Sequence, residues 1–328
     1  MQPLPHLPEP LLERLRHSRN LLAFSGGVDS SALFFTLLHH NISFGVAHVN
    51  YKTRPQSDTE ETHVKTLCDQ HNIPVFTLTC KLPQGNFEHR ARKARYDFFQ
   101  TLASTHGFET LLTAHQLDDR LEWLLMQLCQ GAGAVELLGF KLEESRGTLR
   151  LVRPFLEHTK ASLKTFLYAH DLPYCLDNSN DDPTFLRNRF RARFAGPMLE
   201  EYTSGIRNSF RFLSSDVALL EDTFTHRIDA LFVAKNTPLA LRLVDKAAKH
   251  LGVLMSQAQR KEIDQKDGVA GGRVAVGWTK DAVFIAPFVR LPMPKAFKEA
   301  CRKAGIPPLV RPYMYSKNIA PSALVQTL

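Results

Sequence analysis

Between Leu21 and about Arg153, short apolar runs alternate with longer amphipathic stretches, and small or capping residues separate them. Short, nearly continuous apolar runs are typical of strands that are buried on both faces of a sheet. The expected strands are Leu21 to Phe24, Ser43 to Val49, Pro74 to Thr79, Thr110 to Ala114 and Leu149 to Val152. Strands that alternate with helices in this way predict an α/β fold with a parallel sheet.

The amphipathic stretches between these runs have the periodicity of helices. Ser57 and Glu60 form a capping-box pattern at the start of the first one, and Asn86 is a candidate cap for the second. The expected helices run from about Asp58 to Gln70, from Asn86 to Gly107 and from Asp118 to Gly131. The first part of the chain is therefore expected to form a three-layer α/β domain.

After Pro154 the pattern becomes helical, without intervening strands. Helices are expected from about Lys160 to Ala169, from Pro183 (capped by Asp182) to Phe194, and along an amphipathic stretch from Ile206 to Ile228. Within the second of these, Leu186, Phe190 and Phe194 recur every four residues, which predicts a packing stripe.

Beyond Lys235 the sequence has a mixed character. Two apolar runs, 274–278 and 282–286, flank a polar turn and predict a β-hairpin. A chain of 328 residues also exceeds the usual size of one hydrophobic core. We therefore expect a nucleotide-binding α/β domain over 1–155, a helical region over 156–235 and a small mixed domain over 236–328.

Composition narrows the classes of function. The net charge of +8 and the pI near 9.3 favour a polyanionic partner such as nucleic acid, although many basic proteins bind none. The five cysteines include no C-x-x-C pair, which argues against a disulfide framework, a zinc ribbon or an iron–sulfur site and favours buried or inert thiols. No secretory signal and no apolar run of about 18 residues is found, so a cytoplasmic location without membrane association is expected.

One loop between the first predicted strand and an apolar helix has the composition of a phosphate site. It consists of Ser25, Gly26, Gly27, Val28, Asp29 and Ser30. Paired glycines let backbone N–H groups approach a phosphate, and the following helix adds the positive end of its dipole. The alternative is a plain strand-to-helix turn capped by Asp29 or Ser30. Neither a Walker-type loop nor a dinucleotide fingerprint is present.

This loop resembles the pyrophosphate loop of the N-type ATP pyrophosphatases, which adenylate a substrate oxygen before a nucleophile displaces AMP. Further motifs make the chain similar to the tRNA(Ile)-lysidine synthetases, because they occur in the order found in that family. They are His48-Val49-Asn50, Glu88 with Arg92 and Arg95, Ala114-His115, Asp118-Asp119 with Glu122, Gly131-Ala132-Gly133, Arg153-Pro154, Asp177 to Asn180, and Arg187-Asn188 with Arg191. The resemblance covers roughly residues 20–215.

Several positions depart from the family pattern. Residues unusual for the family are Tyr51, Gln116, Arg120, Trp123 and Gln130. The segment after Lys235 matches only loosely and is similar to the short forms of the family.

The resemblance implies roles for five catalytic candidates: Asp29, Arg95, His115, Asp119 and Glu122. The loop would hold the pyrophosphate, Arg95 would contact the α-phosphate, and His115 would contact the nucleotide or the target base. Asp119 and Glu122, one helical turn apart, would hold the lysine ammonium and help to deprotonate it. The alternatives are an acidic first helical turn that serves the dipole and a solvated basic face.

The resemblance also implies the ligands. ATP, magnesium, L-lysine and a tRNA(Ile) with a CAU anticodon are expected, and Asp29 is the one candidate contact for the metal. The candidate tRNA contacts are Asn180, Arg187, Asn188 and Arg191. A surface charge without RNA is the alternative for the arginines, and a homodimer is left open. The rival functions are another pyrophosphate-loop enzyme that modifies tRNA, such as a thiolase, and a non-catalytic RNA-binding module that responds to ATP.

Overall fold

The computed structural model describes residues 4–53, 56–81, 87–175, 186–220 and 224–327. Contacts between Cα atoms divide the chain into two compact units, unit 1 (1–217) and unit 2 (218–328). Most of the predicted helical region therefore packs in the same unit as the predicted nucleotide-binding domain. No helix among the described residues is long and apolar enough to cross a membrane.

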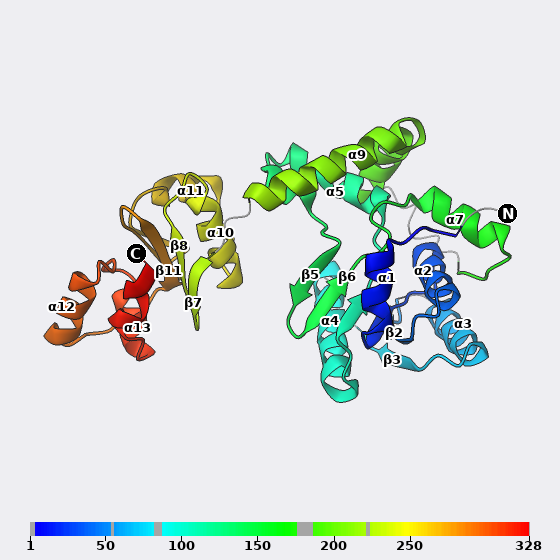
Figure 1. Cartoon of the computed structure of the whole chain (residues 1–328), viewed down its shortest axis with the longest axis horizontal. Helices are drawn as coiled ribbons and strands as arrows, with labels where there is room; N and C mark the ends of the chain where they lie inside the picture. The colour runs from blue at the N-terminus through cyan, green and yellow to red at the C-terminus, as the bar shows by residue number, and fades with distance from the viewer. Residues whose placement is uncertain (1–3, 54–55, 82–86, 176–185, 221–223, 328) are drawn as a thin grey trace. The chain divides into compact units, whose positions relative to one another are not determined.

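Unit 1 alternates helices and strands through its first half (Figure 1). Its strands are β1 (Asn20–Ala23), β2 (Phe44–Asn50), β3 (Val75–Thr79), β4 (Thr110–Leu112), β5 (Glu143–Arg146) and β6 (Leu149–Val152). Its helices are α1 (Glu9–Arg16), α2 (Val28–His39), α3 (Gln56–Gln70), α4 (Phe87–His106), α5 (Leu117–Cys129), α6 (Ala134–Leu138), α7 (Lys160–Ala169), α8 (Leu186–Phe190) and α9 (Gly196–Leu220), with a π-helical segment, Arg191–Ala195, between the last two.

These strands form one sheet in the order β3-β2-β1-β4-β6-β5. All the neighbouring pairs are parallel except β5 with β6, and Asn20 of β1 pairs with Phe44 on one side and with Thr110 on the other. The α/β fold and the five predicted strands are confirmed. The sequence did not predict β5, because Glu-Glu-Ser-Arg is polar and has the composition of an edge strand.

Successive residues of the central strands enter the cores on opposite faces of the sheet. Leu22 and Leu112 pack with α1, α2, α3 and α7, whereas Leu21 and Leu111 pack with α4. This alternation explains the continuous apolar runs, since both faces are covered. A third core joins α5, α6 and α9 and extends unit 1 beyond the sheet.

The helices differ from the sequence predictions at several ends. Helix α3 begins at Gln56, so Ser57 lies inside its first turn instead of capping it. The candidate caps Asn86 and Asp182 lie outside the described residues. The predicted packing stripe on α8 is wrong, because Leu186 and Phe194 are 47% and 49% exposed.

Unit 2 is a five-stranded antiparallel sheet, in the order β7-β8-β11-β10-β9, with helices on both faces. Its elements are β7 (Phe224–Ile228), β8 (Leu231–Lys235), α10 (Ala240–His250), α11 (Gln257–Ile263), β9 (Gly268–Ala270), β10 (Val274–Trp278), β11 (Ala282–Pro287), α12 (Lys295–Lys303), α13 (Arg311–Ser316) and a 3₁₀ segment, Pro321–Thr327. The predicted hairpin is β10 with β11. The predicted helical pattern ran into β7, because a spacing of four residues, as between Phe224 and Ile228, suits a strand as well as a helix.

Candidate active site

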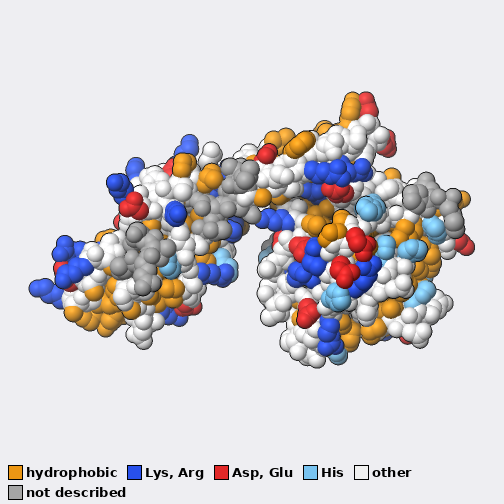
Figure 2. Space-filling model, in the orientation of Figure 1, with side chains coloured by type: hydrophobic (Ala, Val, Ile, Leu, Met, Phe, Trp, Pro, Cys, Tyr) orange, Lys and Arg blue, Asp and Glu red, His pale blue; other side chains and the backbone are white. Residues whose placement is uncertain are grey.

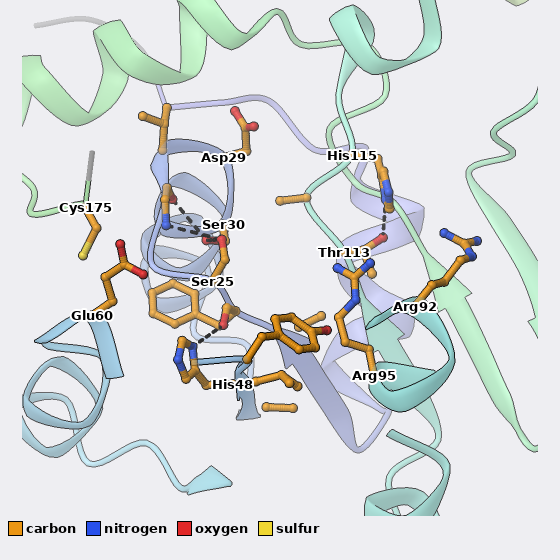
Figure 3. Close-up of a pocket in the computed structure, with 18 of the residues that line it drawn as sticks. Ser25, Asp29, Ser30, His48, Glu60, Arg92, Arg95, Thr113, His115 and Cys175 are labelled. Atoms are coloured by element: carbon orange, nitrogen blue, oxygen red, sulfur yellow. Dashed lines mark hydrogen bonds between the residues drawn. The ribbon is translucent and has the colours of Figure 1, made fainter. Parts of the chain in front are cut away.

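A cavity of about 740 Å³ lies in unit 1 beyond the carboxyl ends of β1, β2 and β4. The order of the strands reverses between β1 and β4, and ligands of doubly wound folds bind at such a switch point. Figure 3 shows side chains from the β1–α2 loop, α3, α4 and the end of β4 directed into this cavity. Acidic, basic and histidine side chains gather on this part of unit 1 in Figure 2.

The loop after β1 leaves the start of α2 without a side-chain cap. Gly27 is the N-cap residue and makes no capping hydrogen bond, so neither Asp29 nor Ser30 caps the turn. Gly26 has φ +83°, and a Cβ there would lie 3.4 Å from Val64 and 3.5 Å from Cys175. The first N–H groups of α2 are therefore available to an anion in the cavity.

Three further contacts fix the shape of this loop. The hydroxyl oxygens of Ser25 and Ser30 lie 3.1 Å apart, and Ser30 donates to the carbonyl of Gly27 at 3.1 Å. The backbone N–H of Cys175 donates to the carbonyl of Gly26 at 2.8 Å. A segment about 150 residues downstream thus supports the loop, a contact that no local sequence pattern reveals.

Asp29 is a carboxylate that lacks a hydrogen-bond partner on one oxygen. Its Oδ1 is buried, and no group in the described part of the chain bonds to it. Burial raises the pKa of Asp29 to about 6, the ammonium of Lys160 opposes that rise, and Asp119 and Asp118 add to it. An unpaired carboxylate oxygen suits a hard cation such as Mg²⁺, which commonly takes one or two carboxylates and fills its other positions with phosphate and water.

Other metal chemistry finds less support among the described residues. No group of three or more His, Cys, Asp or Glu side chains there is arranged to hold a metal ion. All five cysteines are free, two of them, Cys68 and Cys301, are buried, and Cys129 is exposed. The prediction of buried or inert thiols is therefore confirmed, as to burial, for Cys68 and Cys301.

His115 follows β4 and is neutral at ordinary pH. Its Nδ1 lies 2.9 Å from the hydroxyl of Thr113, and its ring stacks on Phe140 with the centroids 5.0 Å apart. Burial, followed by the positive charges of Arg153 and Arg187, lowers the pKa of His115 to about 3. The uncharged imidazole can therefore donate a hydrogen bond at one nitrogen and accept one at the other.

Two arginines of α4 line the cavity beside His115. Figure 3 shows the guanidinium groups of Arg92 and Arg95 near Thr113 and His115. Arg92 lies over the ring of Tyr96 at 5.1 Å, and Arg95 has no acidic partner within the described ranges. Arg95 is therefore free to pair with a phosphate.

The carboxylates of α5 are paired with the arginines that follow them in the chain. Arg187 donates to Asp119 and, at 2.6 Å, to Glu122, and Arg191 donates to Glu122 at 2.5 and 3.2 Å. The side chain of Glu122 is fully buried. The arginines predicted as tRNA contacts thus neutralise the carboxylates predicted as a lysine site.

Asp119 also has a structural role. The side chain of Gln116 accepts from the N–H groups of Asp118 and Asp119, and Asp119 accepts from the N–H of Gln116 at 3.1 Å. Asp118 instead accepts from the N–H of Lys160 at 2.9 Å. Asp119 therefore stabilises the start of α5 and Asp118 the start of α7, and of the two only Asp119 lines the cavity.

Most of the predicted site residues lie together. The cavity is lined by Ser25, Gly27, Val28, Asp29, Ser30, Arg95, His115, Asp119, Arg187 and Arg191. Gly26 shapes the loop, Glu122 lies behind the arginines, Asn188 does not line the cavity, and Asn180 falls outside the described residues.

Sequence reasoning missed Lys160 and Lys164, which line the same cavity from α7. Lys160 is the first residue of α7, and Thr159 caps that helix. The predicted start of a helix just after the sheet was the available signal, because such a start lies near the carboxyl edge of the strands. The ammonium of Lys160 adds positive charge beside Asp29.

Comparisons with known proteins agree with this geometry. A family model described as the PP-loop domain matches residues 6–196. The chain is 46% identical over 315 residues to the tRNA(Ile)-lysidine synthase of Wolinella succinogenes, a match that covers 94% of this chain and 96% of that protein. It is 38% identical to the same enzyme of Campylobacter jejuni, with 96% and 98% covered, and 39% identical to that of Helicobacter pylori, with 93% and 92% covered.

A solved structure supports the fold. The U34-tRNA thiolase NcsA from Methanococcus maripaludis superposes with a TM-score of 0.53 at 13% identity, over 76% of this chain and 89% of that one. Identity at that level shows a shared fold alone, whereas the matches to the synthases span nearly the whole chain. The chain therefore belongs to the tRNA(Ile)-lysidine synthase family and carries its PP-loop domain in unit 1.

Proposed function

We propose that this protein is an ATP-dependent ligase that joins L-lysine to the wobble cytidine of a tRNA(Ile) with a CAU anticodon. One observation carries the proposal beyond family membership. The same cavity is lined by an uncapped pyrophosphate loop and by Asp119, which belongs to a carboxylate–arginine cluster. The first group suits a leaving pyrophosphate, and the second suits an amino acid that carries both charges.

The first step is adenylation of the tRNA. The 2-oxygen of the cytidine attacks the α-phosphorus of ATP, a new oxygen–phosphorus bond forms, and the bond to the pyrophosphate breaks. The N–H groups at the start of α2 hold the leaving pyrophosphate, and Arg95 balances the charge that develops on the α-phosphate. Asp29 would hold a Mg²⁺ ion, which supplies charge neutralisation for the phosphates.

His115 orients a ligand by hydrogen bonding and does not act as an acid catalyst. A pKa of about 3 leaves the imidazole neutral near pH 7. Thr113 and the ring of Phe140 hold its orientation. We assign it to a hydrogen bond with the nucleotide or the target base.

The second step is transfer of lysine. The ε-ammonium binds at Asp119 and Glu122 and passes a proton to the carboxylate of Asp119. The free amine attacks C2 of the cytidine, and the bond from C2 to the oxygen that leaves with AMP breaks. In the ligand-free protein, Arg187 and Arg191 already occupy these carboxylates. Each carboxylate has about four lone-pair sites, so an arginine that shifts toward the lysine carboxylate leaves room for the ammonium.

Labelled lysine provides the test. The purified protein is incubated with ATP, Mg²⁺, labelled lysine and tRNA(Ile), and both the incorporation of label and the release of AMP are followed. We expect equal amounts of lysine incorporated and AMP released, and neither without tRNA. Tight binding of tRNA with no release of AMP would contradict the proposal and favour a non-catalytic module.

A further inference from the structure

The imidazole of His115 rests on an aromatic ring that does not line the cavity. The ring of Phe140 stacks on it with the centroids 5.0 Å apart and the planes 29° apart. The Nδ1 atom lies 2.9 Å from the hydroxyl of Thr113, a contact drawn as a dashed line in Figure 3. One hydrogen bond at one nitrogen leaves the ring free to swing about that contact. The stack with Phe140 therefore fixes the direction of the second ring nitrogen.

The indole of Trp123 holds the segment that carries Phe140. Its Nε1–H donates to the carbonyl of Glu136 at 2.8 Å, and its ring meets the ring of Phe140 edge-on, with the centroids 5.9 Å apart. Gly139 has φ +64°, and a Cβ there would overlap the indole, so the indole packs directly on bare backbone. Trp123 follows Glu122 on α5, and the same helix therefore carries both the carboxylate cluster and this support.

A buried arginine fixes the other end of the same segment. Arg153, which directly follows β6, is 3% exposed. Its guanidinium donates to the carbonyl of Lys141 at 2.8 Å and to the carboxylate of Glu144 at 2.7 Å. The same guanidinium lies 5.4 Å from the centre of the Phe140 ring, within the range of a cation–π attraction. The segment around Phe140 is thus held from α5 on one side and from the end of β6 on the other.

We propose that Trp123 and Arg153 are positioning residues for His115 and that they act through the ring of Phe140. This inference rests on the proposed function, in which His115 bonds the nucleotide or the target base, and deepens it. None of the three supporting side chains lines the cavity, so their effect reaches the reaction through the orientation of the imidazole. A misplacement of about 1 Å lowers the rate of a reaction by about 10²-fold.

The rate of adenylation, followed as pyrophosphate release in a single turnover, tests this orientation. Phe140→Leu keeps an apolar side chain and removes the ring, so it should lower the rate by about 10- to 100-fold and leave the Michaelis constant for lysine unchanged. Phe140→Tyr keeps the stack and should react at close to the rate of the wild type. Trp123→Leu should also lower the rate. Trp123→Phe, which keeps a ring and loses the bond to Glu136, should have a rate between those of Trp123→Leu and the wild type.

A double-mutant cycle separates positioning from a general loss of structure. A protein that carries His115→Gln has no imidazole to orient. Adding Phe140→Leu or Trp123→Leu to it should therefore lower the rate no further. If these substitutions lower the rate as much in the His115→Gln protein as in the wild type, the residues support the fold alone and the proposal is overturned.

Phe76 provides the matched control. Its ring lies 4.4 Å from that of His106, and neither residue lines the cavity. Phe76→Leu removes a contact of the same kind, so it should lower the melting temperature as Phe140→Leu does and leave the rate of adenylation unchanged. An equal loss of rate in Phe76→Leu would overturn the proposal, because any weakened aromatic contact would then be enough.

Nuclear magnetic resonance of the histidine rings gives a test that does not depend on activity. The signals of His115 are identified by their absence in His115→Gln, and the stacked ring of Phe140 displaces them from their ordinary positions. Trp123→Leu should shift the signals of His115 and leave those of His106 in place. Signals of His115 that stay unmoved in Trp123→Leu would overturn the assignment of Trp123.

The two proposals fail in different ways. A wild type that incorporates no lysine and releases no AMP refutes the proposed function. A wild type that does both, together with a Phe140→Leu variant of unchanged rate, refutes only the positioning of His115.

Discussion

At the scale of single residues, Asp29 lines the candidate active site at a position that disfavours the charged form of its carboxyl group. Its Oδ1 is buried without a partner among the described residues, and burial raises its pKa from 3.8 to about 6. The ionised form is thus disfavoured in the folded protein. A carboxylate kept in such a place is typical of a site that binds a cation only when its ligands arrive.

We expect Asp29→Asn to abolish ligation and yet to stabilise the ligand-free fold. Because the folded pKa is raised, the cost of ionising Asp29 is absent below about pH 4, grows between about pH 4 and 6, and is complete above that. At about 1.4 kcal/mol for each pKa unit, the gain at pH 8 is at most about 3 kcal/mol. Thermal unfolding from pH 4 to 8 measures it.

Asp58 supplies the control for the sign of this effect. Hydrogen bonds from Lys52 and Asn50 lower the pKa of Asp58. Its stabilisation is present above its ordinary pKa and is lost as the pH falls, so Asp58→Asn should be neutral or slightly destabilising at pH 8. A gap between Asp29→Asn and the wild type that does not change with pH would contradict the assignment for Asp29.

Asp119→Asn separates the two roles of that residue. An asparagine oxygen still accepts from the N–H of Gln116, so the start of α5 is preserved, whereas the negative charge toward Arg187 and the lysine is lost. We expect unchanged ATP binding and a rate of lysine transfer lowered by about 10²-fold or more. Rapid-quench measurement of AMP formation and lysine incorporation distinguishes the steps.

The neighbouring carboxylate provides the comparison. Asp118 accepts from the N–H of Lys160 and does not line the cavity, and an asparagine there keeps that bond. Asp118→Asn should therefore transfer lysine at close to the rate of the wild type. Full activity of Asp119→Asn would refute the assignment of the lysine site.

At the scale of elements, ion pairs on a buried carboxylate join α5 to α8 and to the π-helical segment after it. Glu122 is fully buried and accepts from both Arg187 and Arg191. The π-helical segment begins at Arg191, and such segments occur often at functional sites. The contact brings together residues 65 and 69 positions apart, and it places one wall of the cavity.

Removing the charge of Glu122 should loosen this contact. Glu122→Gln removes the carboxylate that the two guanidinium groups share. Because the Arg187 side chain is 45% exposed and keeps its pair with Asp119, the expected loss is below the about 3–5 kcal/mol of a fully buried pair. Urea unfolding should report that loss, and hydrogen exchange should show α8 opening first. Glu157→Gln, which breaks an exposed pair with Arg211, should cost less than about 1 kcal/mol, and equal losses in the two variants would contradict the role given to Glu122.

At the scale of the whole molecule, the charge is divided unequally between the two units. Residues 1–217 contain 24 Lys and Arg and 24 Asp and Glu, whereas residues 218–328 contain 17 and nine. Unit 2 therefore carries the entire net charge of +8. Blue side chains are spread over its visible face in Figure 2. A surface of this kind attracts the phosphates of tRNA over a distance, whatever their sequence.

We expect unit 2 to contribute salt-dependent affinity for tRNA. Lys295, Lys298 and Lys303 are exposed on α12 and have no acidic partner among the described residues. Changing all three to glutamine should weaken tRNA binding and reduce the slope of log Kd against log salt by about 0.9 for each phosphate that the variant no longer binds. Filter binding at several salt concentrations measures both quantities.

The control for that experiment lies on unit 1. Lys65 and Lys93 are exposed but pair with Glu61 and Asp97 on their own helices, so glutamine at both positions should change the slope little. A slope that stays unchanged in the α12 variant would show that tRNA does not touch this part of unit 2.

Periodicity and composition were enough to identify the sheet, its strands and the pyrophosphate loop. The apolar character of Leu21, Leu22 and similar runs is enough to predict that they are buried. The loop from Ser25 to Ser30 needs only its neighbours in the chain to form a turn and the start of a helix. These features are local, because strand and helix periods and the dihedral freedom of glycine act over a few residues.

The partners of the charged residues could not be predicted from the sequence. Three features follow from the packing of α7, α8 and α9. Arg187 and Arg191 contact Glu122, Lys160 lies beside Asp29, and Phe194 is exposed. A helix pattern gives the faces of a helix but not which of them meets another element, and the pKa of a group depends on the water removed from it. Burial and long-range pairing exist only in the folded chain. The tertiary structure alone therefore decides which candidate residues line one cavity and which of them pair with one another.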